Sequence, residues 1–295
     1  MMKILLTGSS GYLGSKFIEL FGRDYEILGL SRTSKDLPVD LLDAKRVLEV
    51  SADFNPDFIV HTAAMVGRDK GRENIFDIHV SIMDTLIQCA KVSVSKFVFT
   101  SSESVYGGRE LIGGYVESDV PKPRHEYGRS KLECERLLQE SGVTYLITRS
   151  GRFVGFNKEY DREKQFPDTL KALLNSQSVN LDSEKPFSYA LIDHLAASIA
   201  YYIENDSDDC RLLNISASEG TTYFDLISKI ATQLNITSGL VQPGGCEEGW
   251  LPNSAIDTSL SAQLGYPKLA LDELVDIVSR DYLACSGSLL PEIER

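Results

Sequence analysis

Three glycines follow the first apolar run of the chain, and no other feature of the sequence restricts the possible folds as strongly. The run is Lys3–Thr7, and Gly8, Gly11 and Gly14 come after it at intervals of three residues. Glycines alone also occur in helix caps and tight turns. Between a strand and a helix, however, they let the backbone approach a pyrophosphate, which the N–H groups and dipole of that helix attract. The pattern predicts a dinucleotide-binding turn. The other turn residues expected at the cofactor are Ser10, Tyr12 and Leu13.

Short apolar runs alternate along the chain with stretches whose apolar residues recur at helical spacing. This alternation is typical of parallel strands joined by crossover helices, so we expect an α/β fold with a Rossmann-type, doubly wound parallel sheet. The expected strands are Lys3–Thr7, Tyr25–Leu30, Asp57–His61, Lys96–Ser101, Val143–Arg149 and Leu212–Ser216. The expected helices are Gly11–Phe21, Ala44–Phe54, Asn74–Lys91 and Glu126–Ser141.

The regularity falls after Arg149, which predicts a smaller, discontinuous C-terminal substrate lobe. We expect a dinucleotide-binding domain made of 1–150 plus about 187–218. Residues 151–186 plus 219–295 are expected to form the substrate-binding lobe, with helices at Thr222–Leu234 and Leu271–Tyr282.

The charge and cysteine content exclude several classes of protein. With 30 basic and 43 acidic residues among 295, the net charge is −13, and no block of Lys and Arg offers a patch for nucleic acid or an anionic membrane. The five cysteines form no CxxC pair, so neither a disulfide framework nor a metal site is predicted. Cysteines without a disulfide framework are typical of a reducing compartment. The first residues contain no signal sequence or membrane span, so we expect a cytoplasmic location.

The residues after the second expected strand bear on the choice of cofactor. An acidic residue there would bind the ribose 2′-OH of NAD, but this strand ends in Ser31 and Arg32. A guanidinium in place of a carboxylate favours a 2′-phosphate, so NADP(H) is predicted over NAD(H), with NAD(H) still possible. The alternative is that Arg32 is only a surface cation. Asp40 and Leu41 are either adenine-side contacts or part of a solvated loop.

A Tyr-x-x-x-Lys spacing, which places both side chains on one helical face, occurs three times in this chain. Tyr12/Lys16 overlaps the glycine turn, and Tyr160/Lys164 lies in a highly charged stretch. Tyr127/Lys131 opens a helix that follows the strand ending near Ser102, where parallel sheets bind ligands. A neighbouring ammonium lowers the pKa of a phenol, so this tyrosine could exchange a proton with a carbonyl or alcohol oxygen near neutral pH. Ser102 would hydrogen-bond the same oxygen.

Together these motifs resemble the extended branch of the short-chain dehydrogenase/reductase superfamily, the NAD(P)-dependent nucleotide-sugar epimerases, dehydratases and reductases. The matching segments, in family order, are Thr7–Gly14, His61–Ala64, Ser101–Gly107, Tyr127–Lys131, Arg149–Gly155 and Ile192–Leu195.

The resemblance implies a role for each catalytic residue. Ser102 would be the catalytic serine, Tyr127 the acid/base, and Lys131 the residue that binds the nicotinamide ribose and tunes the tyrosine. It also adds Ala63 and Ala64 to the cofactor contacts and implies a homodimer formed through the helices Asn74–Lys91 and Glu126–Ser141.

Differences between this chain's motifs and those of individual subfamilies exclude some of the family's activities. The 4,6-dehydratases carry Thr-Asp-Glu where this chain has Ser102, Glu103 and Ser104, so the second carboxylate base is missing. Epimerase-reductases of the GDP-fucose type have a cysteine at the position of Ser104. The 4-epimerases generally keep an acid after the second strand, which Ser31 and Arg32 do not supply. The pattern is most similar to NADPH-dependent reductases of nucleotide-linked 4-keto-sugars, near the dTDP-4-dehydrorhamnose reductases. A nucleotide-sugar 4-epimerase with bound NAD and a non-catalytic, NADP-binding regulatory protein remain the alternatives.

Substrate contacts are expected in the irregular region after the fifth strand. Arg152, Arg162 and Lys164 could hold the nucleotide diphosphate, and Glu103 and Ser104 could contact the sugar. The alternative for each is a solvated surface residue, which for a single cation is the more frequent case.

Overall fold

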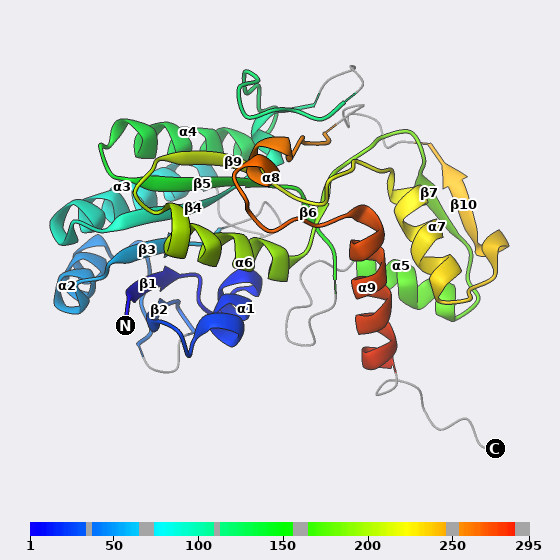
Figure 1. Cartoon of the computed structure of the whole chain (residues 1–295), viewed down its shortest axis with the longest axis horizontal. Helices are drawn as coiled ribbons and strands as arrows, with labels where there is room; N and C mark the ends of the chain where they lie inside the picture. Colours follow the sequence, from blue (N-terminus) through cyan, green and yellow to red (C-terminus); the bar gives the residue numbers. More distant parts are fainter. Residues whose placement is uncertain (34–36, 65–73, 109–112, 156–164, 246–253, 287–295) are drawn as a thin grey trace.

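The computed structural model describes most of the chain and contains a six-stranded parallel sheet (Figure 1). The described residues are 1–33, 37–64, 74–108, 113–155, 165–245 and 254–286. The strand order is β2-β1-β3-β4-β5-β9, and every neighbouring pair is parallel. In chain order, the sheet is extended from β1 first on one side, by β2, and then on the other side, by β3, β4, β5 and β9. This reversal places a topological switch point between β1 and β3. The predicted doubly wound α/β fold is confirmed.

All six expected strands are present with small shifts at their ends. They are β1 (Lys3–Thr7), β2 (Glu26–Leu30), β3 (Phe58–His61), β4 (Lys96–Ser102), β5 (Tyr145–Ser150) and β9 (Arg211–Ile215). The side chains of the inner strands β1, β3, β4 and β5 are mostly buried, because helices cover both faces of the sheet, whereas the edge strand β2 is mostly half-buried.

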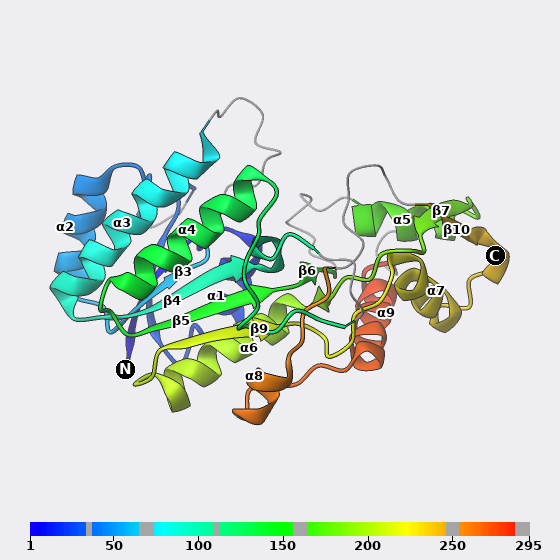
Figure 2. The same ribbon diagram turned by 90° about the horizontal axis from the view of Figure 1, so that it is seen from above.

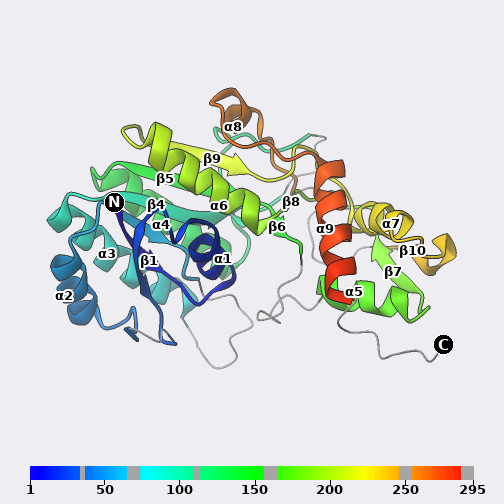
Figure 3. The ribbon, with the colours of Figure 1, turned by 60° about the horizontal axis from the view of Figure 1, so that its bottom comes forward.

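Two helical layers enclose the sheet (Figure 3). On one face lie α1 (Tyr12–Phe21) and α6 (Ile192–Tyr201), and on the other lie α2 (Ala44–Phe54), α3 (Ile75–Ser93) and α4 (Glu126–Glu140). Alternate residues of β1 separate the two cores: Ile4 and Leu6 pack in the cluster with α1 and α6, whereas Leu5 packs in the cluster with α2 and α3. This alternation is the period of a strand that is buried on both faces.

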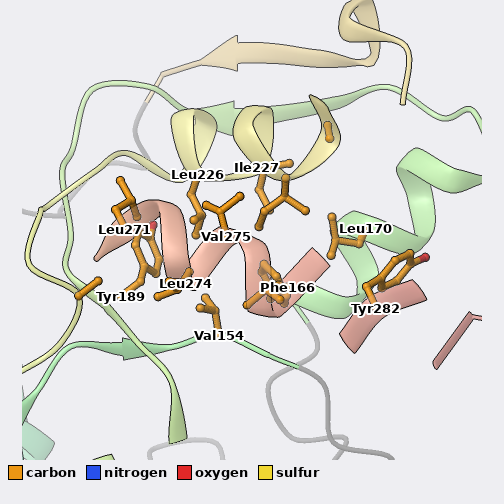
Figure 4. Packing of buried hydrophobic residues seen from close by; sticks show 14 of the residues in the cluster. Val154, Phe166, Leu170, Tyr189, Leu226, Ile227, Leu271, Leu274, Val275 and Tyr282 are labelled. Carbon is orange, nitrogen blue, oxygen red and sulfur yellow. The ribbon is translucent and has the colours of Figure 1, made fainter. Parts of the chain in front are cut away.

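Most of the remaining described elements form a second group beside the carboxyl ends of the strands (Figure 2). Its helices and strands are β6 (Arg152–Phe153), α5 (Gln165–Leu174), β7 (Val179–Asp182), β8 (Tyr189–Ala190), α7 (Tyr223–Gln233), β10 (Val241–Gly244) and α9 (Leu271–Ser286). β7 pairs with β10 and β6 with β8. A hydrophobic cluster between α5, α7 and α9 holds this group together (Figure 4).

The structure adds detail that the sequence pattern did not resolve in this region. Residues 151–186 had no assigned elements, yet they contain α5 and the short strands β6 and β7. The helix α8 (Ser259–Gln263) packs beside β9, so part of 219–295 lies against the large sheet. The proposed division into two domains stays a prediction.

Among the described helices, none is both long enough and apolar enough to cross a bilayer. Within the same residues, no group of three or more His, Cys, Asp or Glu side chains is arranged to hold a metal ion. Cys89 and Cys134 are free and buried, and Cys210 is free and exposed.

Candidate active site

A cleft of about 1070 Å³ lies between the carboxyl ends of the sheet strands and the second group of elements. In Figure 2 the strands β4, β5 and β9 point toward that second group. From the sheet side the cleft is lined by the glycine turn and the ends of β2, β3 and β4, and from the other side by residues of β6, β7, β8 and α7. Open parallel sheets bind their ligands at this edge.

The glycine turn is built so that only glycine fits at two of its positions. Gly8 has a φ of +72°, its N–H donates to Leu30 O at 2.9 Å, and a Cβ there would lie 2.7 Å from Ala63 N. A Cβ on Gly14 would lie 2.2 Å from Gly8 O, so α1 packs directly on the turn. The N-cap of α1 is Gly11, and no side chain of the described residues caps this helix. The start of α1 therefore fits an anionic group as sequence analysis expected.

Nearly all of the predicted cofactor residues lie around this one cleft. Those that line it are Gly8, Ser10, Gly11, Tyr12, Leu13, Ser31, Arg32, Asp40, Leu41, Ala63, Ala64, Tyr127 and Lys131. Gly14 is not among the lining residues. It supports the turn from beneath, because it gives α1 its close contact with Gly8.

The end of β2 is tied to the glycine turn by a side-chain contact. Thr33 Oγ1 donates to Ser10 Oγ at 2.9 Å, and Val39 N donates to Ser31 O at 3.0 Å. The Oγ of Ser31 is buried and has no hydrogen-bond partner among the described residues, although Ser31 lines the cleft. An unpaired buried hydroxyl at this edge fits a polar ligand. Arg32 is exposed at the rim.

The pair Tyr127/Lys131 lies in the first turns of α4, as its spacing predicted. His125 caps this helix by accepting the Gly128 N–H at 3.1 Å, and Tyr127 is partly buried at the cleft. Lys131 is only 2% exposed, and its Nζ donates to Thr100 O at 2.8 Å.

Burial lowers the pKa of Lys131 to about 8, although the charges of Cys134 and Glu135 act in the opposite direction. Lys131 Nζ lies 5.7 Å from the centre of the Tyr127 ring. A cation at this distance favours the phenolate form of the tyrosine.

The other two Tyr-x-x-x-Lys pairs differ from this one. Tyr12 lines the cleft, but Lys16 forms an ion pair with Glu19 at 2.9 Å. Tyr160 and Lys164 lie outside the described residues, as does Arg162.

Ser102 is the last residue of β4 and caps the short 3₁₀ helix η1 (Glu103–Val105) that follows. Its Oγ accepts the Ser104 N–H at 3.2 Å and lies 2.8 Å from Ser104 Oγ. It donates to Glu103 Oε2 at 3.0 Å. Ser102, Glu103 and Ser104, all three predicted to contact the substrate, thus form one hydrogen-bonded group on the cleft wall.

Two histidines that had no predicted role lie close to Lys131. His61 is buried at the cleft, and its Nδ1 lies 2.7 Å from Thr7 Oγ1. His79 Nδ1 lies 2.8 Å from Ser130 Oγ, and its ring is edge-on to Tyr127 with centroids 6.1 Å apart. Burial, helped by the charge of Lys131, lowers the pKa of both imidazoles, that of His79 to about 3. Both rings are therefore neutral near pH 7.

The α3 helix contributes directly to the wall of the cleft. Ile78 and Ile82 line the cleft and are only partly buried, whereas His79 is 6% exposed. Helical spacing identifies the face of α3, but it does not distinguish the core from a cleft wall.

The far wall of the cleft brings together residues that lie far apart in sequence. The Arg152 guanidinium carbon lies 3.4 Å from the centre of the Phe187 ring, and Tyr189 is paired with Arg152 across β6 and β8. Tyr223 of α7 donates to Thr169 Oγ1 at 3.1 Å. Of these lining residues only Arg152 was identified from sequence, because no local motif marks the others.

The comparisons with known sequences agree with this geometry. The family model described as "RmlD substrate binding domain" matches residues 2–262. The chain is 24% identical over 259 residues to methionine adenosyltransferase 2 subunit beta of Bos taurus, covering 82% of this chain and 75% of that protein. It is 29% identical over 156 residues to dTDP-4-dehydrorhamnose reductase of Aggregatibacter actinomycetemcomitans, covering 51% of each.

Solved structures with the same fold include two crystal structures with bound dinucleotide. The dTDP-4-dehydrorhamnose reductase of Bacillus anthracis in complex with NADP has a TM-score of 0.81 and 20% identity, covering 96% of this chain and 99% of that chain. UDP-glucose 4-epimerase of Thermus thermophilus, in complex with NAD, has a TM-score of 0.79 and 21% identity, with the same coverage of 96% and 99%. At these identities the likeness shows the fold.

Proposed function

Since the chain belongs to the family described as the RmlD substrate binding domain, within the extended short-chain dehydrogenase/reductase superfamily, we propose that it reduces a nucleotide-linked 4-keto-sugar with NADPH. The observation that carries this proposal is that Ser102, Tyr127 and Lys131 line the same cleft as the glycine turn. The named reductases among its relatives and structural neighbours support the substrate class.

The cofactor residues have distinct roles in this proposal. The turn at Gly8 and Gly11 and the start of α1 would hold the pyrophosphate, and Arg32 the 2′-phosphate. The remaining contacts would come from Ser31, Asp40, Leu41, Ala63, Ala64 and Lys131. When bound, the reduced cofactor would supply a hydride to the C4 carbonyl.

The chain's own residues would manage the proton and the charge. Tyr127 would hold the proton that the C4 oxygen takes up, at its phenol oxygen. Lys131 would keep that phenol acidic, and Ser102 would donate a hydrogen bond to the C4 oxygen of the substrate. Ser102 now donates to Glu103, so its hydroxyl would have to turn toward the substrate.

The substrate would lie against the far wall of the cleft. Arg152 lines this wall and carries a charge suited to a nucleotide diphosphate, while Glu103 and Ser104 stand beside Ser102. Lys164, outside the described residues, would be the second cation.

The test is incubation of NADPH with dTDP-, GDP- and UDP-linked 4-keto-sugars, followed by the loss of NADPH absorbance. Wild type should turn over at least one of them. Tyr127→Phe should lose at least about a hundredfold in kcat, as expected for a general acid, while NADPH still binds. A Tyr127→Phe variant with most of the wild-type rate would refute the assignment.

A second function is favoured by one specific finding. Several relatives of the chain are named as subunit beta of methionine adenosyltransferase 2, so a non-catalytic, NADP-binding regulatory role is the alternative. Tight NADP binding without oxidation of NADPH by any sugar in the panel would favour it. A 4-epimerase would instead purify with bound NAD and interconvert sugars with no net use of cofactor.

A homodimer through α3 and α4 stays a prediction, to be measured by sedimentation.

A further inference from the structure

A buried ion pair joins α4 to β5 behind the cleft. Glu135 and Arg149 are 1% and 3% exposed. Arg149 Nη2 lies 2.6 Å from Glu135 Oε2, and Arg149 Nε donates to Oε1 at 3.1 Å. Two parallel N–H bonds of this kind fix the mutual orientation of guanidinium and carboxylate as well as their distance.

The same carboxylate is attached to the residue before Ser102. Ser101 Oγ donates to Glu135 Oε1 at 2.5 Å. One turn earlier on α4, Lys131 Nζ donates to Thr100 O at 2.8 Å. Two successive turns of the helix are therefore bonded to two successive residues of β4, which sets the position of α4 along the strand.

Arg149 also holds the turn that follows Ser102. Its guanidinium carbon lies 4.7 Å from the centre of the Tyr106 ring, and Tyr106 is the residue at the end of η1. The Tyr106 hydroxyl donates to Asn214 Oδ1 of β9 at 2.9 Å. The ion pair thus links α4, β4, β5 and the turn after Ser102.

We propose that Glu135 and Arg149 are a positioning pair that sets where Tyr127 and Lys131 stand relative to Ser102. This inference rests on the proposed function. Stability alone does not explain a buried pair of charges, because apolar residues of similar volume often serve as well. Tyr127, Lys131 and Glu135 are spaced four apart, so they share one face of α4, and the ion pair anchors that face.

The pair has an electrostatic effect as well as a geometric one. The groups around Lys131 are His61 of β3, His79 of α3, and Tyr127, Cys134 and Glu135 of α4. Removing the Glu135 charge withdraws a stabilising anion and leaves the Arg149 cation unpaired. Both effects lower the pKa of Lys131 below about 8.

The experiment compares three variants in kcat, KM and thermal stability. Glu135→Gln keeps the size of the side chain and an acceptor for Ser101 but removes the charge. The matched control is Glu133→Gln on the same helix, where the glutamate forms an exposed ion pair with Arg136 at 2.6 Å. Glu135→Gln combined with Arg149→Met removes both charges, so that no buried ion is left without a partner.

We expect Glu135→Gln to lower kcat at least tenfold with a smaller change in the KM for NADPH, and to move the alkaline loss of activity to lower pH. In the double variant, the pH at which activity is lost on the alkaline side should return toward its wild-type value. Its kcat should nevertheless stay at least tenfold below that of wild type. Glu133→Gln should leave all three quantities unchanged. If Glu135→Gln fails to fold, the double variant decides the question.

The pair would be only structural if the double variant had a kcat within twofold of wild type. A crystal structure of the double variant supplies a readout that needs no turnover. We expect Tyr127 to be displaced from its wild-type position relative to Ser102, and an unchanged position overturns the proposal. If wild type reduced no 4-keto-sugar, the proposed function would fail, whereas this structural comparison would still test the positioning pair.

Discussion

Replacing Gly14 by alanine tests whether the glycine turn needs the close contact that the structure shows. The added Cβ would lie 2.2 Å from Gly8 O, 2.8 Å from Gly8 C and 2.9 Å from Ser9 Cα. Ordinary contact begins at 3.4 Å, so α1 or the turn has to move by about 1.2 Å. Every obstructing atom belongs to the backbone, and no side-chain rotation can relieve the clash.

The expected effect on stability is of the same order as the effect on binding, so the two are measured separately. Overpacking costs about 1–3 kcal/mol, and alanine returns about 1 kcal/mol in helix propensity. The net loss of about 0–2 kcal/mol would lower Tm by roughly 0–8 °C. The displacement falls on the turn proposed to hold the pyrophosphate, so we expect the Kd for NADP to rise at least about tenfold, equivalent to about 1.4 kcal/mol.

The assay is a fluorescence titration of NADPH into the folded variant, with thermal unfolding measured alongside. The control is Gly239→Ala, because no atom of the described part of the chain lies within 4 Å of a Cβ added there. The control should keep the wild-type Kd. A Gly14→Ala protein that binds NADPH as tightly as wild type would refute the assignment of this turn to the cofactor.

Three further predictions concern charge. The rate of reduction should fall as pH rises through about 8, where Lys131 loses its proton, and a pH profile of kcat/KM with its limb near 10.5 would contradict this. The His79 imidazole has a pKa of about 3 in the fold, so it takes up a proton on unfolding below about 6.5. The free energy of unfolding should therefore fall by up to about 4 kcal/mol as pH drops from about 6.5 toward 3, and His79→Gln should flatten that slope in urea denaturation. Arg32→Ala should weaken NADP binding roughly tenfold and leave NAD binding unchanged, with the exposed Arg23→Ala as control, and equal losses for both dinucleotides would argue against a 2′-phosphate contact.

The fold class and the first half of the cleft could be predicted because they depend on neighbouring residues. The apolar run Lys3–Thr7 followed by Gly8 and Gly11 specifies a strand, a turn and a helix within a few residues of one another. The four-residue spacing of Tyr127 and Lys131 likewise needs only the geometry of one helix. The structure confirms the doubly wound sheet and places these residues around one cleft.

Apart from Arg152, the residues of the far wall of the cleft could not be predicted, because this wall depends on contacts between distant segments. Tyr189 and Tyr223 reach the cleft from β8 and α7, and the cleft depends on how these elements pack against the sheet. His79 lies among the buried residues of α3, and only the packing of this helix shows that it faces Ser130 and the cleft.

The amino-acid sequence alone determined which residue types were available and which local elements they form. It provides glycines where the backbone must approach a ligand or another backbone segment closely, and a phenol one helical turn from an amine. Burial and charge pairing came from the assembled fold. Lys131 is less basic than an exposed lysine because the fold buries it, and Glu135 meets Arg149 because α4 packs against β5. Such effects depend on solvent exclusion by residues remote in sequence, so no local pattern encodes them.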